Sequence, residues 1–399
     1  MPDRPLAHFR FQSPVAVTGA GAACALGTGL AACLEKLNAG ISGLRPLGSS
    51  TLAYPPGLGD LPVGWIADRA VFKGRRYGAA SNAAVHVARE AVAAAGWDKS
   101  ETRQAWLYAG TSRGNAGERA GAWQARRPIA KFAASNTMHS EVAAAVSLQL
   151  GIHGPWQVIS NGCAAGLDAL GQAALAVAMG WTPRALVVAV DLPLVSPLLE
   201  DFASTGLLST NGVNDPYGMA TAGFLPGEGA AAVTLETTGT RVSWCQLLAY
   251  AANNDAYDAV ALPPGGRPLA ALMVAMATGG AHPVAICPHA TGTSAHRVSE
   301  TAALAHAFHG AARPSLHVFK PFTGHALGAS GLLDTALLAG TLRHARMAGN
   351  LPEITAPDSG WCLPAVPRML APGDRVLKIA AGMGGHNAGV LLQCPRHGI

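Results

Sequence analysis

The sequence predicts a layered α/β fold built from two halves. Short runs of β-branched or aliphatic residues are followed by glycine turns and then by alanine-rich helical stretches, an alternation typical of layered α/β architecture. The chain has 399 residues, a length at which one simple domain is no longer the default. Similar kinds of element lie on both sides of Thr237–Arg241, so we expect a pseudo-duplicated fold with halves at residues 1–240 and 241–399.

Seven short segments have the aliphatic or β-branched composition of strands. In chain order these predicted strands are Val15–Thr18, Ala105–Ala109, Ala185–Val190, Ala230–Leu235, Val284–Ile286, Leu316–Phe319 and Val390–Leu392. Five longer segments have the composition and the apolar spacing of helices. These predicted helices are Ala79–Ala95, Ser140–Leu150, Ala164–Met179, Arg297–Phe308 and Ala329–Ala345.

The composition favours a large buried interior and disfavours nucleic acid as a partner. Hydrophobic residues make up 50% of the chain and charged residues 13%, so we expect a large core, an oligomer interface or both. The formal net charge of +5 is modest, and no block of Lys and Arg is interleaved with aromatic residues. An acidic protein partner is compatible with this charge.

No segment has the length and apolar character of a membrane span, which needs about 20 uncharged residues. The most apolar stretch, Leu167–Trp181, is interrupted by Asp168, Gln172 and Gly180, which favours a buried helix. The first residues, Met1–Arg10, carry charges without an apolar signal-peptide region. We therefore expect a cytoplasmic protein that does not enter the membrane.

The cysteines predict free thiols. Their number is odd and none forms a CxxC pair, which argues against both a disulfide framework and a zinc site. The seven positions are 24, 33, 163, 245, 287, 362 and 394.

One cysteine, Cys163, has the setting of a nucleophile. The segment Ser160–Gly166 follows the apolar run Trp156–Ile159 and leads directly into an Ala/Leu-rich helix. A thiol at a helix N-terminus is exposed to the positive end of the helix dipole, which favours the thiolate, so we expect a lowered pKa. The alternative is a buried structural cysteine, and this motif alone does not separate the two.

A second motif, Pro288–Ser294, follows the predicted strand Val284–Ile286. It places His289 at the end of a strand, where catalytic bases are often held on a rigid scaffold. The hydroxyls of Thr291 and Thr293 could bind a polar substrate arm. A lone histidine is more often structural than catalytic. The two threonines that follow it after a strand reduce this preference for a structural role.

Two further motifs lie near the C-terminus. Lys320 and His325 are five residues apart in a glycine-containing turn between a predicted strand and a predicted helix, so both side chains can reach one cavity. A solvated lysine and a capping histidine are the simpler explanation of either residue alone. The glycine-rich run Gly382–Gly389 precedes the last strand, and such backbone can present N–H groups to an oxyanion.

A dinucleotide site is not expected. Gly19 and Gly21 follow the first strand, but Cys24 stands where the third glycine of the fingerprint belongs, and no acidic residue ends a second strand about 20 residues further on. The sequence also has no nucleotide P-loop and no GxSxG or HExxH motif.

Together these motifs resemble the β-ketoacyl-acyl-carrier-protein synthases, in particular the elongating condensing enzymes of type II fatty-acid synthesis. The resemblance begins at Val15–Gly21, continues through Cys163 and Gly227–Gly229, and ends at Gly382–Gly389, in the order of the family. It implies a thiolase-like fold, in which two βαβαβαββ halves stack as five αβαβα layers. It also implies a dimer, either a homodimer or a heterodimer with a related ketosynthase.

The resemblance implies a role for each motif. Cys163 would accept an acyl chain from an acyl carrier protein as a thioester. His289 and His325 would stabilise the enolate formed when a malonyl thioester on the carrier loses its carboxyl group, and that carbanion would attack the acyl-enzyme. Lys320 would hold a network of histidine and glutamate, with Glu300 as its partner.

The binding of substrate is implied in the same way. The backbone N–H groups of Cys163 and Met383 would form an oxyanion hole, and Thr291 and Thr293 would bind the pantetheine arm. No metal or redox cofactor is required. A basic cluster falls where the family often docks its acidic carrier protein, with a merely solvated surface as the alternative; it consists of Lys73, Arg75 and Arg76.

The chain departs from the family pattern at several positions. Alanines follow the nucleophile in place of serines, Thr221 and Ala222 replace an Arg-Asp pair, and Arg297 stands where an acidic residue is common. The two aromatic gate positions of the terminal loop are Ala381 and Met383. Because Ala is small and Met is flexible, we expect a permissive acyl pocket and a specialised enzyme of polyketide or polyene-like synthesis.

Two other classes of protein stay open. A chain-length-factor-like subunit shapes the pocket of a ketosynthase heterodimer without catalysis, but such subunits typically lack the nucleophile that this chain has at Cys163. A heterodimer in which this chain is the active member is a further possibility. A thiolase, with a Cys-His-Cys site, lacks the lysine and histidine of the 320–325 turn.

Overall fold

One hydrogen-bonded sheet of eleven strands runs through the part of the chain described by the computed structural model, which is residues 6–74, 76–118, 120, 133–277, 282–310 and 312–395. The strands follow one another across the sheet as β11 (Ser315–Leu316), β10 (Ala285–Cys287), β14 (Arg375–Ala381), β15 (His386–Gln393), β9 (Cys245–Asn254), β1 (Leu6–Cys24), β8 (Gly229–Thr237), β7 (Arg184–Asp191), β5 (Trp106–Gly110) and β6 (Trp156–Ile159), with β2 (Gly27–Thr28) paired to β1.

The long strand β1 joins two wings of this sheet. Its first part, from Leu6 to Val17, pairs with β9, and its second part, from Val15 to Cys24, pairs with β8. Each wing has the same pattern of directions. In one wing β5 is parallel to β6 and β7, and β8 is antiparallel to β7; in the other β10 is parallel to β11 and β14, and β15 is antiparallel to β14.

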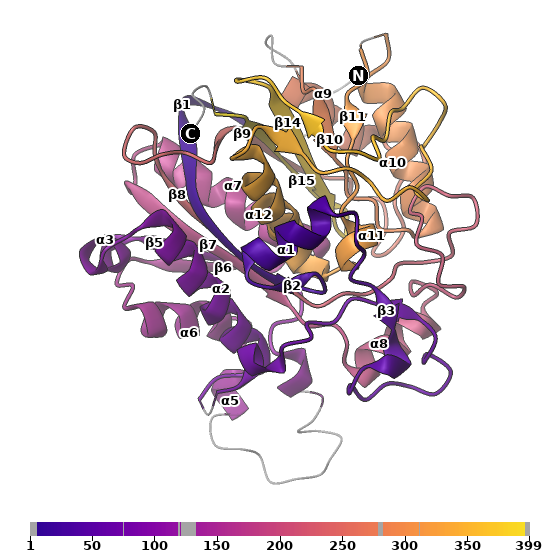
Figure 1. Cartoon of the computed structure of the whole chain (residues 1–399), viewed down its shortest axis with the longest axis horizontal. Helices are drawn as coiled ribbons and strands as arrows, with labels where there is room; N and C mark the ends of the chain where they lie inside the picture. Colours follow the sequence, from indigo (N-terminus) through magenta and orange to yellow (C-terminus); the bar gives the residue numbers. More distant parts are fainter. Residues whose placement is uncertain are drawn as a thin grey trace.

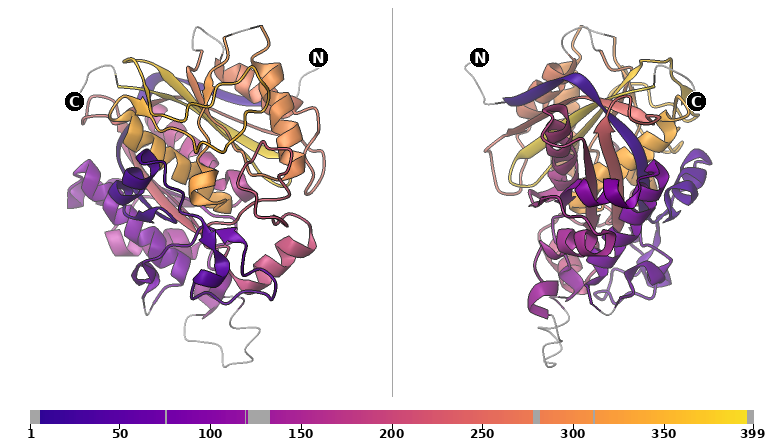
Figure 2. Two further views of the ribbon diagram at one scale, coloured as in Figure 1. Left: turned by 45° about the vertical axis from the view of Figure 1, so that its right-hand side comes forward. Right: turned by 90° about the vertical axis from the view of Figure 1, so that its left-hand side faces the viewer.

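The helices form three layers around the two wings, so the five alternating layers expected from the sequence are present (Figure 1). The middle layer, α7 (Ala165–Ala178) and α12 (Ser330–Leu342), contacts strands of both wings. One outer layer consists of α2 (Ala79–Ala95) and α6 (Glu141–Leu150), and the opposite one of α9 (Arg267–Ala277) and α10 (Ser294–Ala307). Figure 2 shows these layers from two further sides, with β1 running along both wings.

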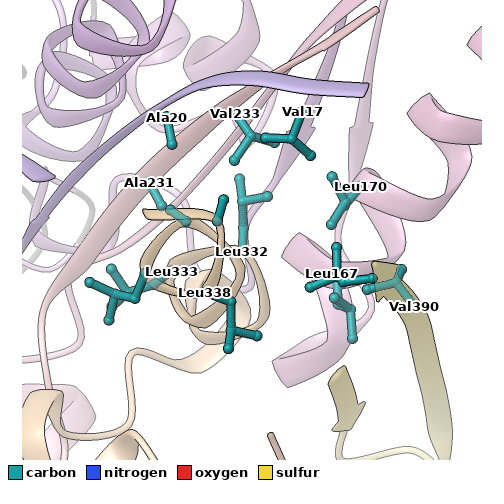
Figure 3. Close-up of a cluster of buried hydrophobic side chains, with 14 of the residues drawn as sticks. Val17, Ala20, Leu167, Leu170, Ala231, Val233, Leu332, Leu333, Leu338 and Val390 are labelled. Atoms are coloured by element: carbon teal, nitrogen blue, oxygen red, sulfur yellow. The ribbon is translucent and has the colours of Figure 1, made fainter. Parts of the chain in front are cut away.

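The main hydrophobic core surrounds the two central helices. Every residue of α12 is buried, which agrees with a helix that is apolar on all sides. Glycines let the helices approach closely, because a Cβ at Gly331 would lie 2.7 Å from the Cβ of Leu167. Figure 3 shows the side chains of this core, drawn from α7, α12, β1, β8 and β15: Val17, Leu167, Leu170, Val233, Leu332, Leu333, Leu338 and Val390.

Smaller elements complete the described chain. They are the helices α1 (Leu30–Asn38), α3 (Lys99–Gln104), α5 (Ala133–Asn136), α8 (Ser196–Ser204) and α11 (Lys320–Thr323), and the two-stranded pairs β3 (Arg45–Pro46) with β4 (Pro62–Val63) and β12 (Arg346–Met347) with β13 (Arg368–Met369). None of the helices in the described residues is both long enough and apolar enough to cross a membrane.

The five predicted helices are all present, and α2 has the predicted bounds. The predicted strand at Leu316–Phe319 is wrong beyond Leu316, because the chain leaves the sheet there and enters α11. Four strands of the large sheet, β2, β6, β9 and β14, were not predicted, and neither were the short pairs β3–β4 and β12–β13. Alanine and asparagine make β9 a weak strand by propensity, and Arg375 and Lys378 interrupt the apolar run of β14, so pairing with neighbouring strands determines both.

Candidate active site

Cys163 lies in a tight turn between β6 and α7. The chain passes from β6 through Gly162, with a φ of 69°, into a short 3-10 turn at Gly162–Ala164 and then into α7. A positive φ costs glycine little, so Gly162 adopts this conformation without the strain that a side chain would bring. Cys163 is 6% exposed, so the turn presents the thiol to a buried cavity.

His325 contacts the thiol from the opposite segment. Its Nε2 lies 3.2 Å from Cys163 Sγ, and its Nδ1 lies 3.1 Å from Ser330 Oγ at the start of α12. The backbone of His325 is fixed on both sides, since its N–H donates to Leu225 and its carbonyl accepts from Gly227. The GEG turn of the sequence therefore holds the histidine in place.

His289 completes a convergent set of three. It follows β10, and its ring packs edge-on against the ring of His325 with the centroids 5.4 Å apart. One potential ligand atom each from Cys163, His289 and His325 lies within 4.8 Å of the other two. In the described part of the chain, this is the only cluster of three or more His, Cys, Asp or Glu side chains close enough to hold a metal ion. The structure thus brings together the predicted nucleophile and both histidines that the sequence singled out.

The protonation of the thiol differs from the expectation. Burial raises the pKa of Cys163 to about 11, while the charges of Lys320 and Arg113 act in the opposite direction. The predicted lowering of the pKa at the helix N-terminus is wrong, because removal of the thiolate from water outweighs the field of the helix end. At rest Cys163 is a thiol, and the adjacent His325 Nε2 is in position to take its proton.

Both histidines are held neutral. Burial, and after it the charge of Lys320, places the pKa of His289 and the pKa of His325 well below the ordinary value. A neutral imidazole has one nitrogen that donates and one that accepts. Ser330 can donate to or accept from His325 Nδ1, so His325 can present Nε2 in either role.

The glycine-rich terminal loop lies over the nucleophile. A Cβ at Gly382 would lie 3.2 Å from the backbone nitrogen of Cys163, so a side chain at this position would crowd the turn of the thiol. The backbone N–H of Met383 forms a hydrogen bond to the Cys163 thiol that lowers its pKa. The structure therefore places the two predicted oxyanion-hole residues side by side.

A cavity of about 500 Å³, counted with its open mouth, leads to these groups. Thr291, Thr293, Ala381 and Met383 line it, and the Thr293 side chain also accepts a hydrogen bond from the backbone of His296 as the N-cap of α10. The remaining lining residues are mostly apolar: Cys163, Phe202, Leu207, Phe224, Val260, Leu262, His289, His296, His325, Leu327 and Gly382.

Comparison with known families agrees with this geometry. The model of the β-ketoacyl synthase N-terminal domain matches residues 12–240, and that of the C-terminal domain matches residues 244–352. The chain belongs to the β-ketoacyl synthase family.

Two relatives come from different branches of this family. A polyketide β-ketoacyl synthase 1 of Streptomyces cyaneus is 31% identical over 279 residues, which cover 64% of this chain and 64% of that protein. The 3-oxoacyl-[acyl-carrier-protein] synthase 2 of Staphylococcus aureus is 27% identical over 259 residues, which cover 61% of this chain and 64% of the relative. The match thus spans less than two thirds of the length of either relative.

Solved ketosynthases share the fold. A type II PKS ketosynthase in complex with its acyl-carrier protein superimposes with a TM-score of 0.83 at 21% identity, over 96% of this chain and 99% of the other. The ishigamide ketosynthase/chain length factor superimposes with a TM-score of 0.85 at 22% identity, over the same shares of the two chains. The expected thiolase-like fold is therefore confirmed.

The partner predicted for Lys320 is wrong. Lys320 is buried, and its Nζ lies 3.6 Å from Asp334 Oδ2, while no ion pair between Lys320 and Glu300 occurs within the described ranges. Glu300 lies in the second turn of α10, directly beneath the loop that carries His289. Because of the way α10 packs, Glu300 contacts that loop. Lys320 has Asp334 of α12 as its nearest carboxylate.

Glu300 instead supports the backbone around His289. Its carboxylate accepts hydrogen bonds from the N–H of His289 at 2.7 Å, the N–H of Ala290 at 2.9 Å and the hydroxyl of Tyr217 at 2.9 Å, and His296 Nε2 lies 3.1 Å away. Burial alone would raise the pKa of Glu300, but His296 and the two N–H groups hold it at about 2. Glu300 is therefore a buried anion that fixes the His289 loop.

Two charged residues of the site were missed. Asp334 lies in the apolar helix α12, and Lys378 lies in β14 between Leu377 and Ile379. A single charge within an otherwise apolar run was the available signal, because such a residue must find a partner when the run is buried.

Other departures from the family pattern have structural counterparts. The Thr221 hydroxyl donates to the Gly292 carbonyl at 2.5 Å, which ties its loop to the His289 loop where the family's ion pair is absent. Arg297 is half-buried and contacts the sulfur of Met219. In the basic cluster, Lys73 and Arg76 are exposed, whereas Arg75 lies outside the described residues.

Proposed function

We propose that this chain is an active β-ketoacyl-ACP synthase, an acyltransferase that joins a malonyl unit on acyl carrier protein to an acyl chain held on Cys163. The observation that carries the proposal is the 3.2 Å approach of His325 Nε2 to Cys163 Sγ, with His289 beside them. A covalent acyl-enzyme divides the condensation into two easier steps.

In the first step the acyl chain is transferred to the enzyme. His325 Nε2 takes the thiol proton, and the Cys163 sulfur attacks the carbonyl carbon of the acyl thioester. The negative charge on the carbonyl oxygen is stabilised by the N–H groups of Cys163 and Met383. The carrier thiolate then leaves and receives the proton from His325, so that both histidines are neutral again.

In the second step the carbon–carbon bond forms. His289 and His325 donate hydrogen bonds to the thioester oxygen of the malonyl group, and its carboxyl group leaves as CO₂. The enolate carbon attacks the acyl-enzyme carbonyl, and Cys163 is released as a thiolate that takes up a proton. Each donor to a developing oxyanion contributes roughly 3 to 4 kcal/mol of barrier lowering.

The natural substrates are acyl and malonyl thioesters on an acyl carrier protein. The type II PKS relative was solved with its carrier protein, and the exposed Lys73 and Arg76 offer positive charge to an acidic carrier. Thr291 and Thr293 at the cavity are the proposed contacts of the pantetheine arm. Ala381 and Met383 in place of aromatic residues support a specialised polyketide or polyene-like pathway, with fatty-acid synthesis as the other.

We propose that the chain works as a dimer in the cytoplasm, with halves at 1–240 and 241–399. Among the strands that the structure describes, the terminal strand β6 pairs on one side only, and Trp156 on it is 42% exposed, so a second ketosynthase chain can add to this edge. All seven cysteines are free thiols, as in proteins of a reducing compartment.

The alternative is a chain-length-factor-like partner subunit, since one structural relative is a ketosynthase/chain length factor. The discriminating experiment mixes the protein with an acyl-carrier thioester and malonyl-carrier protein and measures the product by mass spectrometry. We expect a β-keto product two carbons longer. A folded protein that neither decarboxylates malonyl-carrier nor extends the acyl chain would favour the partner subunit.

A further inference from the structure

Lys378 is a fully buried lysine in the middle of a sheet wing. It lies in β14, opposite Cys287 of β10 on one side and Val390 of β15 on the other, and its side chain is 0% exposed. Removing an ammonium group from water costs several kcal/mol unless the group is well paired. A lysine at this position therefore needs an explanation in terms of its partners.

Its ammonium links three segments that carry the site. Lys378 Nζ donates to Asp334 Oδ2 at 2.5 Å and to the carbonyl of Pro288 at 3.1 Å. Pro288 is followed by His289, Asp334 lies on the helix that begins at Ser330 beside His325, and β14 continues into the loop of Met383. One buried cation thus connects the supports of both histidines and of the oxyanion loop.

The same ammonium competes with Lys320 for one carboxylate. Lys320 Nζ lies 3.6 Å from the Asp334 oxygen that Lys378 contacts at 2.5 Å. Across the part of the chain that the structure describes, Lys320 Nζ has no hydrogen-bond partner, although Lys320 is 5% exposed. The shorter contact shows that Asp334 is engaged by Lys378, and Lys320 is left as a buried cation without a close acceptor.

The buried cluster holds two ammonium groups, and Lys378 supplies one of them. Its two carboxylates, Glu300 and Asp334, face two ammonium groups, Lys320 and Lys378, while the charge of Asp334 keeps the pKa of Lys378 high in spite of burial. If Lys378 were replaced by an apolar residue, Asp334 would have Lys320 as its remaining ammonium partner. Lys320 would then be drawn towards Asp334 on α12.

We propose that Lys378 is a positioning residue of the condensation site: by engaging Asp334 and the Pro288 carbonyl, it fixes the His289 loop and keeps Lys320 from forming a hydrogen bond to Asp334. The inference rests on the proposed function. Lys320 is the foremost charge acting on both histidines, and Lys378 adds to it. The charged and titratable groups around the two rings are Cys163, Tyr217, His296, Glu300, Lys320, Asp334 and Lys378.

The primary test replaces Lys378 by an apolar residue of similar length, Lys378→Met, with Lys36→Met on the exposed side of α1 as the control for loss of a lysine. We expect kcat for malonyl-carrier decarboxylation to fall at least about tenfold and KM to change little. Loss of a nearby positive charge raises the pKa of His289 and of His325. The acidic limb of the pH profile therefore moves to higher pH, whereas Lys36→Met leaves it in place.

A second variant separates positioning from folding. In Lys378→Met/Asp334→Leu the carboxylate is also removed, which often restores or improves stability when a buried ion pair becomes an apolar pair. Lys320 then has no carboxylate on α12 to be drawn towards, so we expect part of the lost kcat to return. A folded Lys378→Met with the kcat and pH profile of the wild type would overturn the inference, and so would a folded double variant no more active than the single one.

The inference can fail separately from the proposed function. If the wild type does not decarboxylate malonyl-carrier, the proposed function is wrong, yet the pKa values of His289 and His325 can still be measured by NMR titration. A rise of both values in Lys378→Met relative to the wild type supports the role of Lys378, and unchanged values contradict it.

Discussion

The two sides of the candidate site differ in what surrounds them. Around Cys163 the cavity is lined by apolar side chains such as Phe202, Phe224 and Leu327, and burial keeps the proton on the thiol. Behind His289 lies a cluster of buried charges, Glu300, Lys320, Asp334 and Lys378. In the proposed function the apolar side serves transfer of the acyl chain, whereas the charged side, together with burial, holds the histidines neutral and in place for decarboxylation.

The largest expected effect comes from removing the His289 ring, which lies in front of the buried charges. In His289→Ala one donor to the malonyl thioester oxygen is lost, so we expect decarboxylation of malonyl-carrier to slow by about 100- to 1,000-fold. Transfer of the acyl chain to Cys163 depends on His325 and is expected to persist. Stopped-flow or quench assays of the two half-reactions check this, and an equal loss in both would mean that the two sides do not have separate tasks.

Glu300→Gln tests how much the charged side contributes to the stability of the fold. The pKa of Glu300 is about 2 in the fold against an ordinary value of 4.5. A lowered pKa stabilises the fold at pH values above 4.5, and this contribution is lost as the pH falls from about 4.5 towards 2. We therefore expect the variant to lose about 3 kcal/mol of unfolding free energy at pH 7, by urea denaturation, with a smaller difference from the wild type at pH 4. A difference independent of pH would contradict the assignment.

Met383→Phe tests the apolar side alone. A rigid aromatic ring at the cavity wall narrows the space that the flexible methionine leaves open. We expect the preference among acyl-carrier primers to shift towards shorter chains by up to about tenfold in kcat/KM, with malonyl decarboxylation little changed. Identical chain-length profiles for the variant and the wild type would rule out Met383 as a gate.

The smallest expected effect comes from Arg113, a positive charge beside the apolar side of the site. The guanidinium carbon of Arg113 lies 5.7 Å from the ring centre of Phe202, and its charge lowers the pKa of Cys163. In Arg113→Met that pKa rises further, so alkylation of Cys163 by iodoacetamide slows by a few-fold at a given pH. Arg89→Met, on the exposed face of α2, is the control, and equal alkylation rates in all three proteins would exclude the effect.

Local patterns predicted much of the fold and the site. The strand, turn and helix around Cys163 lie within one short segment, and α2 begins and ends where its composition indicates. Convergence of Cys163, His289 and His325 was predicted from the family resemblance and the order of the motifs, since spacing along the chain does not show which loops meet.

The remainder depends on contacts between distant segments. Whether Lys320 pairs with Glu300 or Asp334 is decided by how α10 and α12 pack, and neither helix's own sequence specifies this. The raised pKa of Cys163 arises from burial that is complete only in the assembled fold. Lys378 escaped prediction together with the strand β14 that carries it, because strand pairing rather than propensity holds it in the sheet.

The central claim is that Cys163 carries the acyl chain, and intact-mass measurement tests it most directly. After incubation with an acyl-carrier thioester, the wild type is predicted to gain the mass of one acyl group, which peptide mapping assigns to Cys163, while Cys163→Ala gains none. An acyl adduct of equal yield in Cys163→Ala, or one mapped to any of the other six cysteines, would contradict the account.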